Sequence, residues 1–516
     1  DILIGIDAGT SVIKSVAFQL DGRQIAVASV PNRYTTRADG AAFQSLDETW
    51  TDCAQTLRDL AEKVPGLAER TAAIAVTGQG DGTWLVGKDN RPVTDGWLWL
   101  DARGSATAAR LRKDEHRARF ERTGTGLNAC QMGVQLAHMD ATTPEILDAT
   151  EVALHCKDWL YLNLTNVRAT DPSEANFTFG NYRTRTYSDT VIASLGLTHR
   201  RGLLPEILDG VGQTHGLSAQ AAEQTGLLKG TPVALAYVDV VCTGMGAGLY
   251  TPGETTGCTI VGSTGMHMRA TPASDVTLSA EPSGYVMVLP VPGNVAQIQT
   301  NMASTLNIDW LLGVGADLIG EMGGSVSHAE MVARIEGWLA RTKPGEVIYH
   351  PYISEAGERG PFIDTNARAG FAGLGSKHGF ADLLRAVIEG LGYAARDCYD
   401  AMGGAPEVVR LTGGAARSAA LRKILSAALG SSVCTTSREE AGAAGAAMTA
   451  AVAIGAYSDM NACIGDWVQP LLGPAEAPDA DLAARYNALF PSYRTGRQNA
   501  VPIWETLAAL KETHHA

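Results

Sequence analysis

Residues 1–18 read DILIGIDAGTSVIKSVAF, and this stretch decides the fold class. Two short apolar runs, Ile2–Ile6 and Val12–Phe18, flank the polar turn Asp7–Ser11, which holds a carboxylate, a glycine and two hydroxyl groups. A β-branched run, a glycine-centred break and a second alternating run predict strand, tight turn, strand. Carboxylates suit hydrated Mg²⁺, and hydroxyls with exposed N–H groups suit phosphate oxygens. The stretch therefore indicates a hairpin for a nucleotide's phosphates, although taken alone an ordinary hairpin with polar turn residues is the simpler interpretation.

The bulk composition sets limits on the partners. A chain of 516 residues is too long for one hydrophobic core and suits two large domains or three ordinary ones. Its hydrophobic content of 45% and charged content of 19% are typical of a folded soluble protein. The formal net charge of −14 argues against nucleic acid or an anionic membrane as partner. It does not argue against a nucleotide, which a local pocket of N–H groups and one or two cations can hold.

The cysteines and the apolar segments predict the compartment. Eight cysteines are scattered with no CxxC pair, which favours reduced thiols over disulfides or a zinc site. No basic region followed by an apolar segment opens the chain, so we expect a cytoplasmic protein. The long uncharged run 441–458 is mostly alanine and glycine. It is too weakly apolar for a membrane span and predicts a helix packed closely on a sheet.

A second stretch has the pattern of the opening hairpin. Thr255–Met268 reads as a strand that breaks at Gly262, Ser263, Thr264 and Gly265 before a further strand. Two such hairpins suggest two similar α/β halves facing each other across a cleft, each presenting a turn to phosphate.

Three further strands end in polar or glycine-rich turns. The strand Thr71–Thr77 runs into GQGDG at 78–82, and Pro232–Ala236 leads to Asp239. Val408–Thr412 ends at the glycine pair 413–414 before a predicted helix, Ser418–Leu429. Backbone N–H groups at such a junction can contact a ribose or phosphate, although glycines there can also serve packing alone.

With these motifs the chain resembles the FGGY family of carbohydrate kinases from Ile4 to about Tyr457. Residues 5–11 with Lys14 resemble the family's first phosphate motif, 262–265 its second, and 411–421 its adenosine motif. The most specific match is Ala369–Glu389 (AGFAGLGSKHGFADLLRAVIE), which satisfies the C-terminal signature. The resemblance implies two actin-like, ribonuclease-H-like α/β domains around a catalytic cleft. We place an N-terminal domain at 1–247, a C-terminal domain at 248–460, and a Pro-rich linker with a helical tail at 461–516. The sequence also predicts a helix over Leu46–Lys63 and a last helix near Leu482–Leu489.

The resemblance also implies roles for individual residues, with ATP and Mg²⁺ as cofactors. Asp239 accepts the proton of the substrate hydroxyl; the competing interpretation is that it caps a turn before Gly244. Asp7 holds Mg²⁺ through water, and Asp239 is the second residue expected at the metal. The residues expected to contact the nucleotide are Gly9, Thr10, Ser11, Lys14, Gly262, Ser263, Thr264, Gly413, Gly414, Ala415 and Ser418.

The substrate class is predicted from departures within the family. Gln79-Gly80-Asp81-Gly82 stands where xylulose kinases have Gln-Met-His-Gly and glycerol kinases Gln-Arg-Glu-Thr. An ionised carboxylate at position 81 only accepts hydrogen bonds, so it suits a row of hydroxyls better than a carbonyl. Gly80 removes the arginine of the glycerol enzymes and leaves room for a longer substrate. The residues expected to contact the substrate are Gln79, Gly80, Asp81, Trp99, Asp101 and Arg103, with Trp84 as a weaker candidate; pairing of Arg103 with Asp101 is the alternative.

These residues are most similar to the polyol kinases that act on erythritol, a small-molecule substrate. The alternatives are a xylulose or other ketopentose kinase within the family, and a non-catalytic sugar sensor or an actin-like ATPase on the same fold. The sequence further predicts no nucleic-acid or membrane partner and allows a homodimer. It assigns no roles within residues 121–230.

Overall fold

Two six-stranded sheets form the frame of the molecule in a computed structural model that describes residues 1–113 and 116–513. The first sheet has the order β14 (His215–Gly216), β15 (Pro232–Leu235), β6 (Thr71–Gly78), β1 (Ile2–Ala8), β2 (Val12–Gln19), β3 (Gln24–Pro31). The second has the order β18 (Tyr285–Val288), β19 (Asn294–Asn301), β17 (Gly265–Pro272), β16 (Thr256–Val261), β22 (Val408–Thr412), β23 (Ser432–Thr435).

The two sheets share one strand pattern. In the first, β1, β2 and β3 pair antiparallel, and β6 and β15 add parallel to β1. In the second, β16, β17 and β19 pair antiparallel, and β22 and β23 add parallel to β16. Both predicted hairpins are therefore confirmed, and each opens the sheet of its own half. The prediction of two similar α/β halves is confirmed as well.

Helices cover the sheets and join them. The helix α1 matches its predicted range, and its N-cap Ser45 accepts a hydrogen bond from the Glu48 N–H. The longer helices are α1 (Leu46–Lys63), α12 (Thr305–Glu321), α15 (Phe380–Ala401), α16 (Ala419–Leu429), α17 (Ala441–Ala453) and α19 (Ala480–Thr513). A helical insertion in the first half comprises α3 (Ser105–Lys113), α4 (His116–Thr123), α5 (Met132–Thr142), α6 (Pro144–Asp148), α7 (Cys156–Thr165), α8 (Pro172–Phe179), α9 (Asp189–Ser194) and α10 (Ala219–Thr225).

Shorter elements complete the framework. The remaining helices are α2 (Leu67–Arg70), α11 (Asp239–Ala247), α13 (His328–Val332), α14 (Ile335–Ala340) and α18 (Met460–Trp467). The remaining strands are β4 (Thr35–Thr36), β5 (Ala42–Gln44), β7 (Trp84–Val86), β8 (Gly96–Trp97), β9 (Val152–Leu154), β10 (Ala169–Thr170), β11 (Gly180–Asn181), β12 (Thr186–Tyr187), β13 (Glu206–Ile207), β20 (Ile348–His350) and β21 (Gly370–Ala372).

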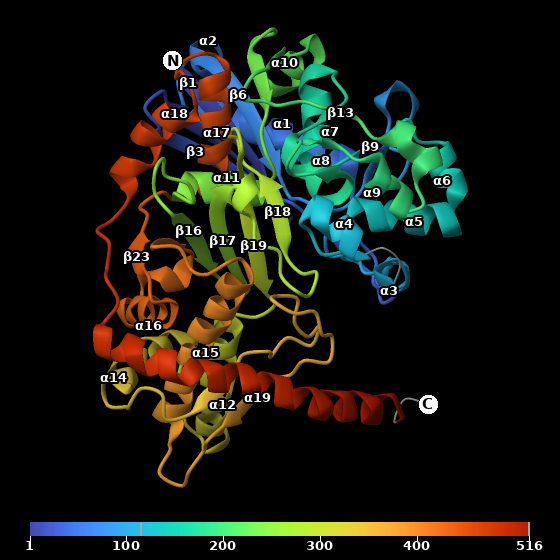
Figure 1. Ribbon diagram of the computed structural model, residues 1–516. Helices are drawn as coiled ribbons and strands as arrows, with labels where there is room; N and C mark the ends of the chain where they lie inside the picture. The colour runs from blue at the N-terminus through green and yellow to red at the C-terminus, as the bar shows by residue number, and fades with distance from the viewer. Residues whose placement is uncertain (114–115, 514–516) are drawn as a thin grey trace.

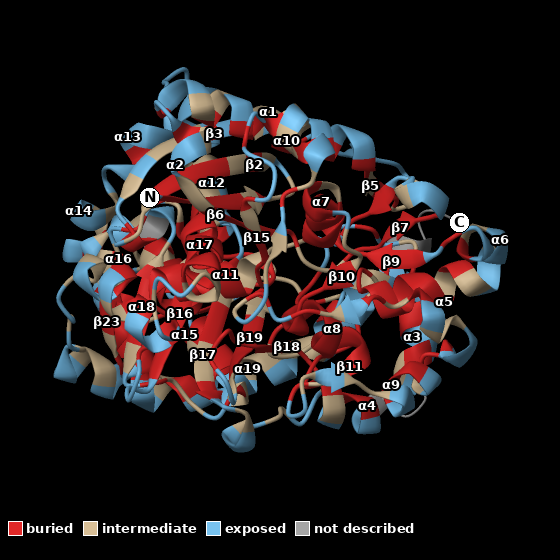
Figure 2. Cartoon of the chain, turned by 90° about the horizontal axis from the view of Figure 1, so that it is seen from above, coloured by how far each residue is buried: buried red, intermediate tan, exposed pale blue. Residues whose placement is uncertain are grey.

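The central core lies between the sheets, where α11 and α17 pack against each other (Figure 1). Side chains of β1, β6, α11, β16, β17 and α17 belong to one buried cluster there, and Figure 2 shows this middle region almost entirely buried. The approach of the backbones is close: a Cβ on Gly5 would lie 2.0 Å from the Ala443 carbonyl oxygen. The predicted helix packed closely on a sheet is thus confirmed. Residues 441–453, which we placed in the C-terminal half, return to the first sheet and contact β1 and β6.

The tail differs from the prediction. A single helix, α19, runs from Ala480 to Thr513 with Pro491 and Pro502 inside it, instead of a short helix near 482–489. Proline usually ends a helix because it lacks the N–H and clashes with the preceding turn. Here Tyr486, Phe490 and Tyr493 are buried in the core of the second half, and this tertiary packing outweighs the local cost. The prediction was wrong because it used local signals alone.

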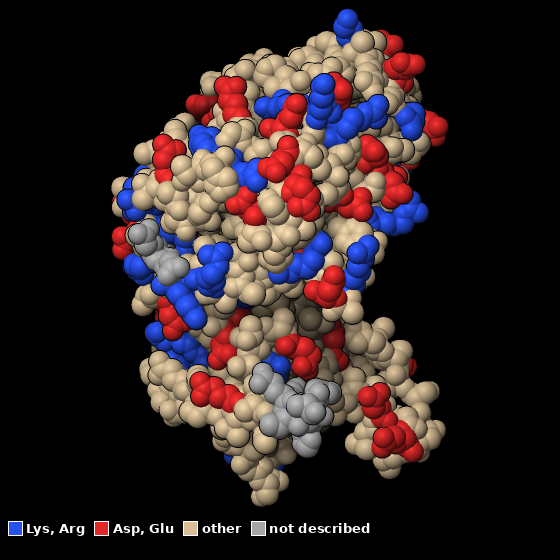
Figure 3. Space-filling model, turned by 90° about the vertical axis from the view of Figure 1, so that its right-hand side faces the viewer, with Lys and Arg blue, Asp and Glu red and all other residues tan. Residues whose placement is uncertain are grey.

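The cysteines and the apolar segments were the subject of two predictions from composition. All eight cysteines are free and buried. Within the described ranges, no helix combines the length and apolar character needed to cross a bilayer. On the face shown in Figure 3, Lys and Arg are interspersed with Asp and Glu rather than gathered into one basic patch.

Candidate active site

A chain of hydrogen bonds connects the turn of the first hairpin to the loop that follows β6, residues 79–82. The Thr10 hydroxyl donates to Gln79 Oε1 over 3.0 Å and accepts from Trp99 Nε1 over 2.7 Å. Gln44 donates from Nε2 to the Thr10 carbonyl over 2.8 Å, and its Oε1 accepts from Gln79 Nε2 over 2.7 Å. Three residues that the sequence analysis placed in two motifs therefore meet at one point. Gln44, which it missed, joins them from the short strand β5.

Two carboxylates lie close enough to affect each other beside this turn. Asp239 is the first residue of α11, and its Oδ1 accepts the Val240 N–H over 2.7 Å. Burial raises the pKa of Asp239 to about 7, and the negative charge of Asp7 adds to the rise. Burial likewise raises the pKa of Asp7 to about 6, although the Lys14 ammonium opposes the rise. Such mutually repelling acids favour the arrival of a proton or a cation.

Lys14 is engaged within the protein. Its ammonium lies 2.9 Å from the carboxylate of Glu440, the N-cap residue of α17. The first turn of α17 also approaches the other side of the site, because a Cβ on Gly442 would lie 2.3 Å from Asp7 Oδ2. The helix that returns from the second half therefore packs directly against the first hairpin.

An ion pair between Arg103 and Asp101 stabilises the loop that follows β8. Arg103 donates to Asp101 over 2.6 Å, and its guanidinium lies 3.4 Å from the ring centre of Trp97. Asp101 is 1% exposed and also accepts the Ala42 N–H over 2.9 Å. The geometry favours the pairing alternative for these two residues. Trp99 is exposed beside the hairpin, and Trp84 is fully buried in the core.

Asp81 meets a side chain from the opposite half. The Tyr285 hydroxyl, on β18, donates to Asp81 Oδ2 over 3.0 Å, and the Cys130 thiol lies 3.6 Å from the same oxygen. The other oxygen, Oδ1, is buried and has no hydrogen-bond partner among the described residues. Asp81 adopts a positive φ of 56°, and burial raises its pKa. Its free acceptor is available to a ligand.

A second buried carboxylate, which the sequence analysis missed, lies on the other side of Gly80. Glu174 in α8 is 0% exposed, and neither of its oxygens has a hydrogen-bond partner among the described residues. A Cβ built on Gly80 would lie 3.2 Å from Glu174 Oε1. Burial raises the pKa of Glu174 well above its ordinary value, although the nearby Lys157 ammonium opposes this.

The second hairpin and the adenosine motif are neighbours in the second sheet. Ser263 and Thr264 are exposed at the turn, which is held by hydrogen bonds from the Ser304 and Thr305 N–H groups. Gly413 follows β22 with φ 94°, and a Cβ there would lie 2.5 Å from the Val261 carbonyl oxygen. This close approach requires glycine.

The adenosine motif continues into a short helix and then α16. Gly414 and Ala415 belong to a 3₁₀ helix over Gly414–Arg417. The Ser418 hydroxyl accepts the Leu421 N–H and caps α16. Ser418 thus fixes where α16 begins.

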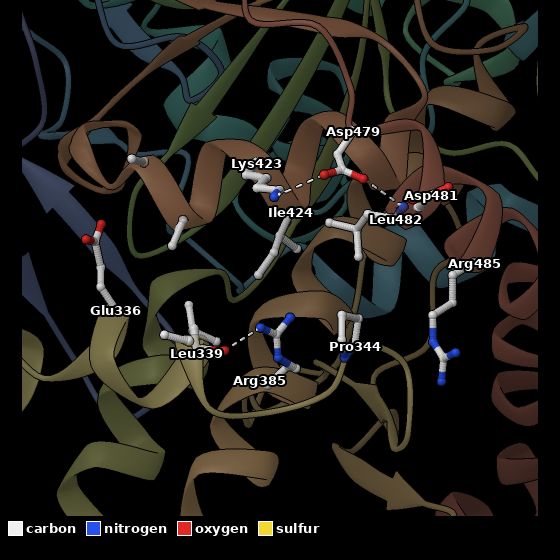
Figure 4. Close-up of a pocket in the computed structure, with 13 residues that line it drawn as sticks. Glu336, Leu339, Pro344, Arg385, Lys423, Ile424, Asp479, Asp481, Leu482 and Arg485 are labelled. Atoms are coloured by element: carbon white, nitrogen blue, oxygen red, sulfur yellow. Dashed lines mark hydrogen bonds and ion pairs between the residues drawn. The ribbon is translucent and has the colours of Figure 1, made fainter.

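A cavity of about 640 Å³ lies alongside α16, between α14 and the start of α19 (Figure 4). Its lining groups largely bind one another: Lys423 lies 3.0 Å from Asp479, and Arg385 donates to the Leu339 carbonyl over 2.6 Å. No sequence-predicted site residue is among the described residues that line it.

Two family models cover most of the chain. The model described as "FGGY family of carbohydrate kinases, N-terminal domain" matches residues 2–246, and the corresponding C-terminal domain matches residues 257–454. An erythritol kinase from Brucella abortus (strain 2308) is 61% identical over 512 residues, covering 99% of this chain and 98% of that protein. A xylulose kinase from Bacillus subtilis (strain 168) is 24% identical over 508 residues, covering 95% of this chain and 96% of that protein.

Solved structures agree on the fold. The crystal structure of a xyloylose kinase from Brucella ovis matches with a TM-score of 0.85 at 22% identity, covering 99% of this chain and 100% of that one. A Plasmodium falciparum glycerol kinase with ADP matches with a TM-score of 0.79 at 16% identity, covering 97% of each chain.

Proposed function

Because this chain belongs to the FGGY family of carbohydrate kinases, we propose that it transfers the terminal phosphoryl group of ATP to a hydroxyl of a small polyol, with erythritol first. The observation that carries the proposal is the 61% identity to the erythritol kinase of Brucella abortus over nearly the full length of both chains. The xylulose kinases compared with this chain are 23–27% identical.

Phosphoryl transfer asks the protein to position two reactants, balance charge on the phosphates and orient the attacking hydroxyl. In our proposal Asp239 accepts the proton of that hydroxyl. Its position supports this role, because it opens α11 beside Asp7 and keeps one carboxylate oxygen free of the Val240 bond. A raised pKa near 7 makes it a stronger base than an ordinary aspartate at the pH where it is still ionised.

The two carboxylates also fit a divalent cation. The charge of Asp7 raises the pKa of Asp239, and a cation bound near both carboxylates would remove that repulsion. Among the described residues there is no cluster of three or more metal-ligating side chains. Mg²⁺ bound mainly by phosphate oxygens and water needs only one or two protein carboxylates. Mg²⁺ with ATP would supply charge neutralisation on the phosphates, and Asp7 would hold it.

The nucleotide contacts follow the two hairpins and the adenosine motif. The Thr10 hydroxyl donates to Gln79. To bind a phosphate oxygen, this hydroxyl would first have to give up that hydrogen bond. The backbone N–H of Thr10 is the other group of this residue that could bind phosphate. Ser263 and Thr264 are exposed at the second turn and available to phosphate oxygens. Gly414 and Ser418 would border the adenosine.

The pocket supports a polyol over a ketose. Asp81 Oδ1 is a buried acceptor without a partner, and a hydroxyl supplies the donor that it lacks. A ketone oxygen supplies none and itself needs a donor. A ketopentose kinase is the second candidate, since xylulose kinases are the more distant relatives along the whole chain.

A coupled ADP-release assay with a panel of polyols and ketoses at fixed ATP tests the proposal. We expect sugar-dependent ADP release that is fastest with erythritol. Preference for a ketopentose would overturn the polyol assignment. ADP release without any sugar would indicate an ATPase, and no release with any sugar would indicate a sensor. Size-exclusion chromatography with light scattering and localisation by fractionation test the further predictions of a homodimer and a cytoplasmic site.

A further inference from the structure

The contacts of the buried Glu174 carboxyl group do not explain why an acid stands at this position. Glu174 lies in the first turn of α8, and all eight residues of the helix are buried. Neither of its oxygens makes a hydrogen bond with a described residue. Burying a polar group without a partner costs free energy, and a carboxyl group costs more than most. Such a residue points to a ligand that completes its hydrogen bonding.

Two other buried acids of this chain are satisfied by their contacts. Glu389 in α15 accepts the Gly345 N–H and the Tyr486 hydroxyl. Asp171 caps α8 by accepting the Ser173 N–H and lies 2.7 Å from the Lys157 ammonium. These acids have structural roles that their contacts explain, and Glu174 does not share that pattern.

Glu174 lies beside the loop that follows β6, residues 79–82. A Cβ on Gly80 would lie 3.2 Å from Glu174 Oε1 and 2.5 Å from Val238 Cγ2. The carboxyl group therefore borders the space that a side chain at position 80 would take. The glycerol enzymes of the family carry an arginine at that position. The next residue, Asp81, has its own buried acceptor without a partner, Oδ1.

Behind Glu174, a histidine contacts its other oxygen without forming a hydrogen bond. His155 Nε2 lies 3.3 Å from Glu174 Oε2, and His155 Nδ1 lies 3.1 Å from Asp158 Oδ2. The buried Lys157 ammonium lies 2.7 Å from both Asp158 and Asp171. This arrangement places Oε2 toward the histidine and leaves Oε1 toward Gly80.

We propose that Glu174 Oε1 binds a hydroxyl of the polyol, as a specificity-determining residue next to Asp81, and that glycine at position 80 leaves room for Val238 and for the carboxyl group. The inference rests on the proposed function, since it takes a polyol as the substrate. Two acceptors on either side of Gly80 would then bind hydroxyl groups of one substrate molecule.

Steady-state kinetics of the full chain test this inference with the variants Glu174→Ala, Glu174→Gln and Gly80→Ala. Because burial raises the pKa of Glu174 and so favours its uncharged form, a hydrogen bond to it is worth roughly 2- to 10-fold in affinity. We therefore expect Glu174→Ala to lower kcat/KM for erythritol by about that factor with KM for ATP unchanged. Glu174→Gln, which keeps an acceptor at Oε1, should recover part of the loss. Gly80→Ala should imitate Glu174→Ala, and the double variant should be less impaired than the product of the two effects.

Substrate analogues separate direct contact from a structural role. The wild type should discriminate against butane-1,2,4-triol or butane-1,2,3-triol, each of which lacks one hydroxyl of erythritol. Glu174→Ala should lose much of the discrimination against one of them. Glu389→Gln removes a buried acid of the second half and serves as the matched control, with discrimination unchanged. Where Glu174→Ala does not fold, Glu174→Gln and Gly80→Ala carry the same comparison.

Unchanged discrimination against both triols in the Glu174 variants would overturn the inference, as would an equal rise in KM for ATP and for erythritol. These results would leave the proposed function intact when the wild type phosphorylates erythritol. If the wild-type protein instead prefers a ketose, the proposed function is wrong. In that case the Glu174 variants are compared on the preferred ketose, and an unchanged KM for it overturns the inference as well.

Discussion

The exchange Asp239→Asn should make the protein inactive and more stable at the same time. Folding buries this carboxyl group and raises its pKa from 3.8 to about 7. At 1.36 kcal/mol for each pH unit, the ionised form costs the folded state about 4 kcal/mol. Below pH 3.8 both folded and unfolded chains carry the proton and no cost arises. As the pH rises toward 7 the unfolded chain releases its proton first, so the folded state loses stability, and above pH 7 the full cost is present.

Asparagine carries no charge and keeps an oxygen for the Val240 N–H. We therefore expect Asp239→Asn to match the wild type near pH 4 and to exceed its stability by up to about 4 kcal/mol at pH 8. Urea unfolding of both proteins at pH 5 and pH 8, in EDTA and without nucleotide, measures the difference. Turnover should fall by roughly 10²- to 10⁴-fold, the usual contribution of a general base, while ATP still binds by calorimetry. Equal stability at pH 8 would refute the burial argument, and substantial turnover would remove Asp239 from the role of base.

Three further predictions follow from the same geometry. With saturating ATP, kcat/KM for the polyol should fall about tenfold per pH unit below pH 7 as Asp239 takes up its proton. The fall should be steeper below pH 6, because Asp7 then takes up its proton as well. A flat profile from pH 5 to 8 would contradict the assignment of Asp239. Asp81→His should raise KM for erythritol more than KM for ATP, because it replaces a pure acceptor, and unchanged polyol kinetics would count against this pocket. Gly445→Ala should lower stability by about 1–3 kcal/mol or more, since its Cβ would lie 2.0 Å from the Cys242 carbonyl oxygen. Gly465→Ala, which meets nothing within 4 Å, is the matched control in thermal unfolding.

Much of the fold follows from local patterns in the chain. The opening hairpin, the helix α1 and the second hairpin have alternating or helical apolar periods and glycine turns, and the structure contains each of them. The alanine- and glycine-rich run 441–458 predicted close packing, and α17 lies against β1 and α11. These features are local because backbone sterics and side-chain periodicity act over a few residues.

The site is different, because its parts come from remote segments. The residues of the first turn and of 79–81 were found from their motifs. Gln44, Tyr285 and Glu174 were not, since each is an ordinary polar residue in its own segment. Gln44 reaches Thr10 across 34 positions, and Tyr285 reaches Asp81 across 204. No pattern within a window of sequence signals such contacts.

Neighbouring residues are enough to predict the two α/β halves and the family, because strands, glycine turns and motif spacing are local features of the chain. The folded molecule is needed to show which acids are left without partners, how α17 returns to the first sheet and why α19 continues through two prolines. Burial and packing decide these features. Both depend on side chains that lie far apart in the chain and meet only when the molecule is folded.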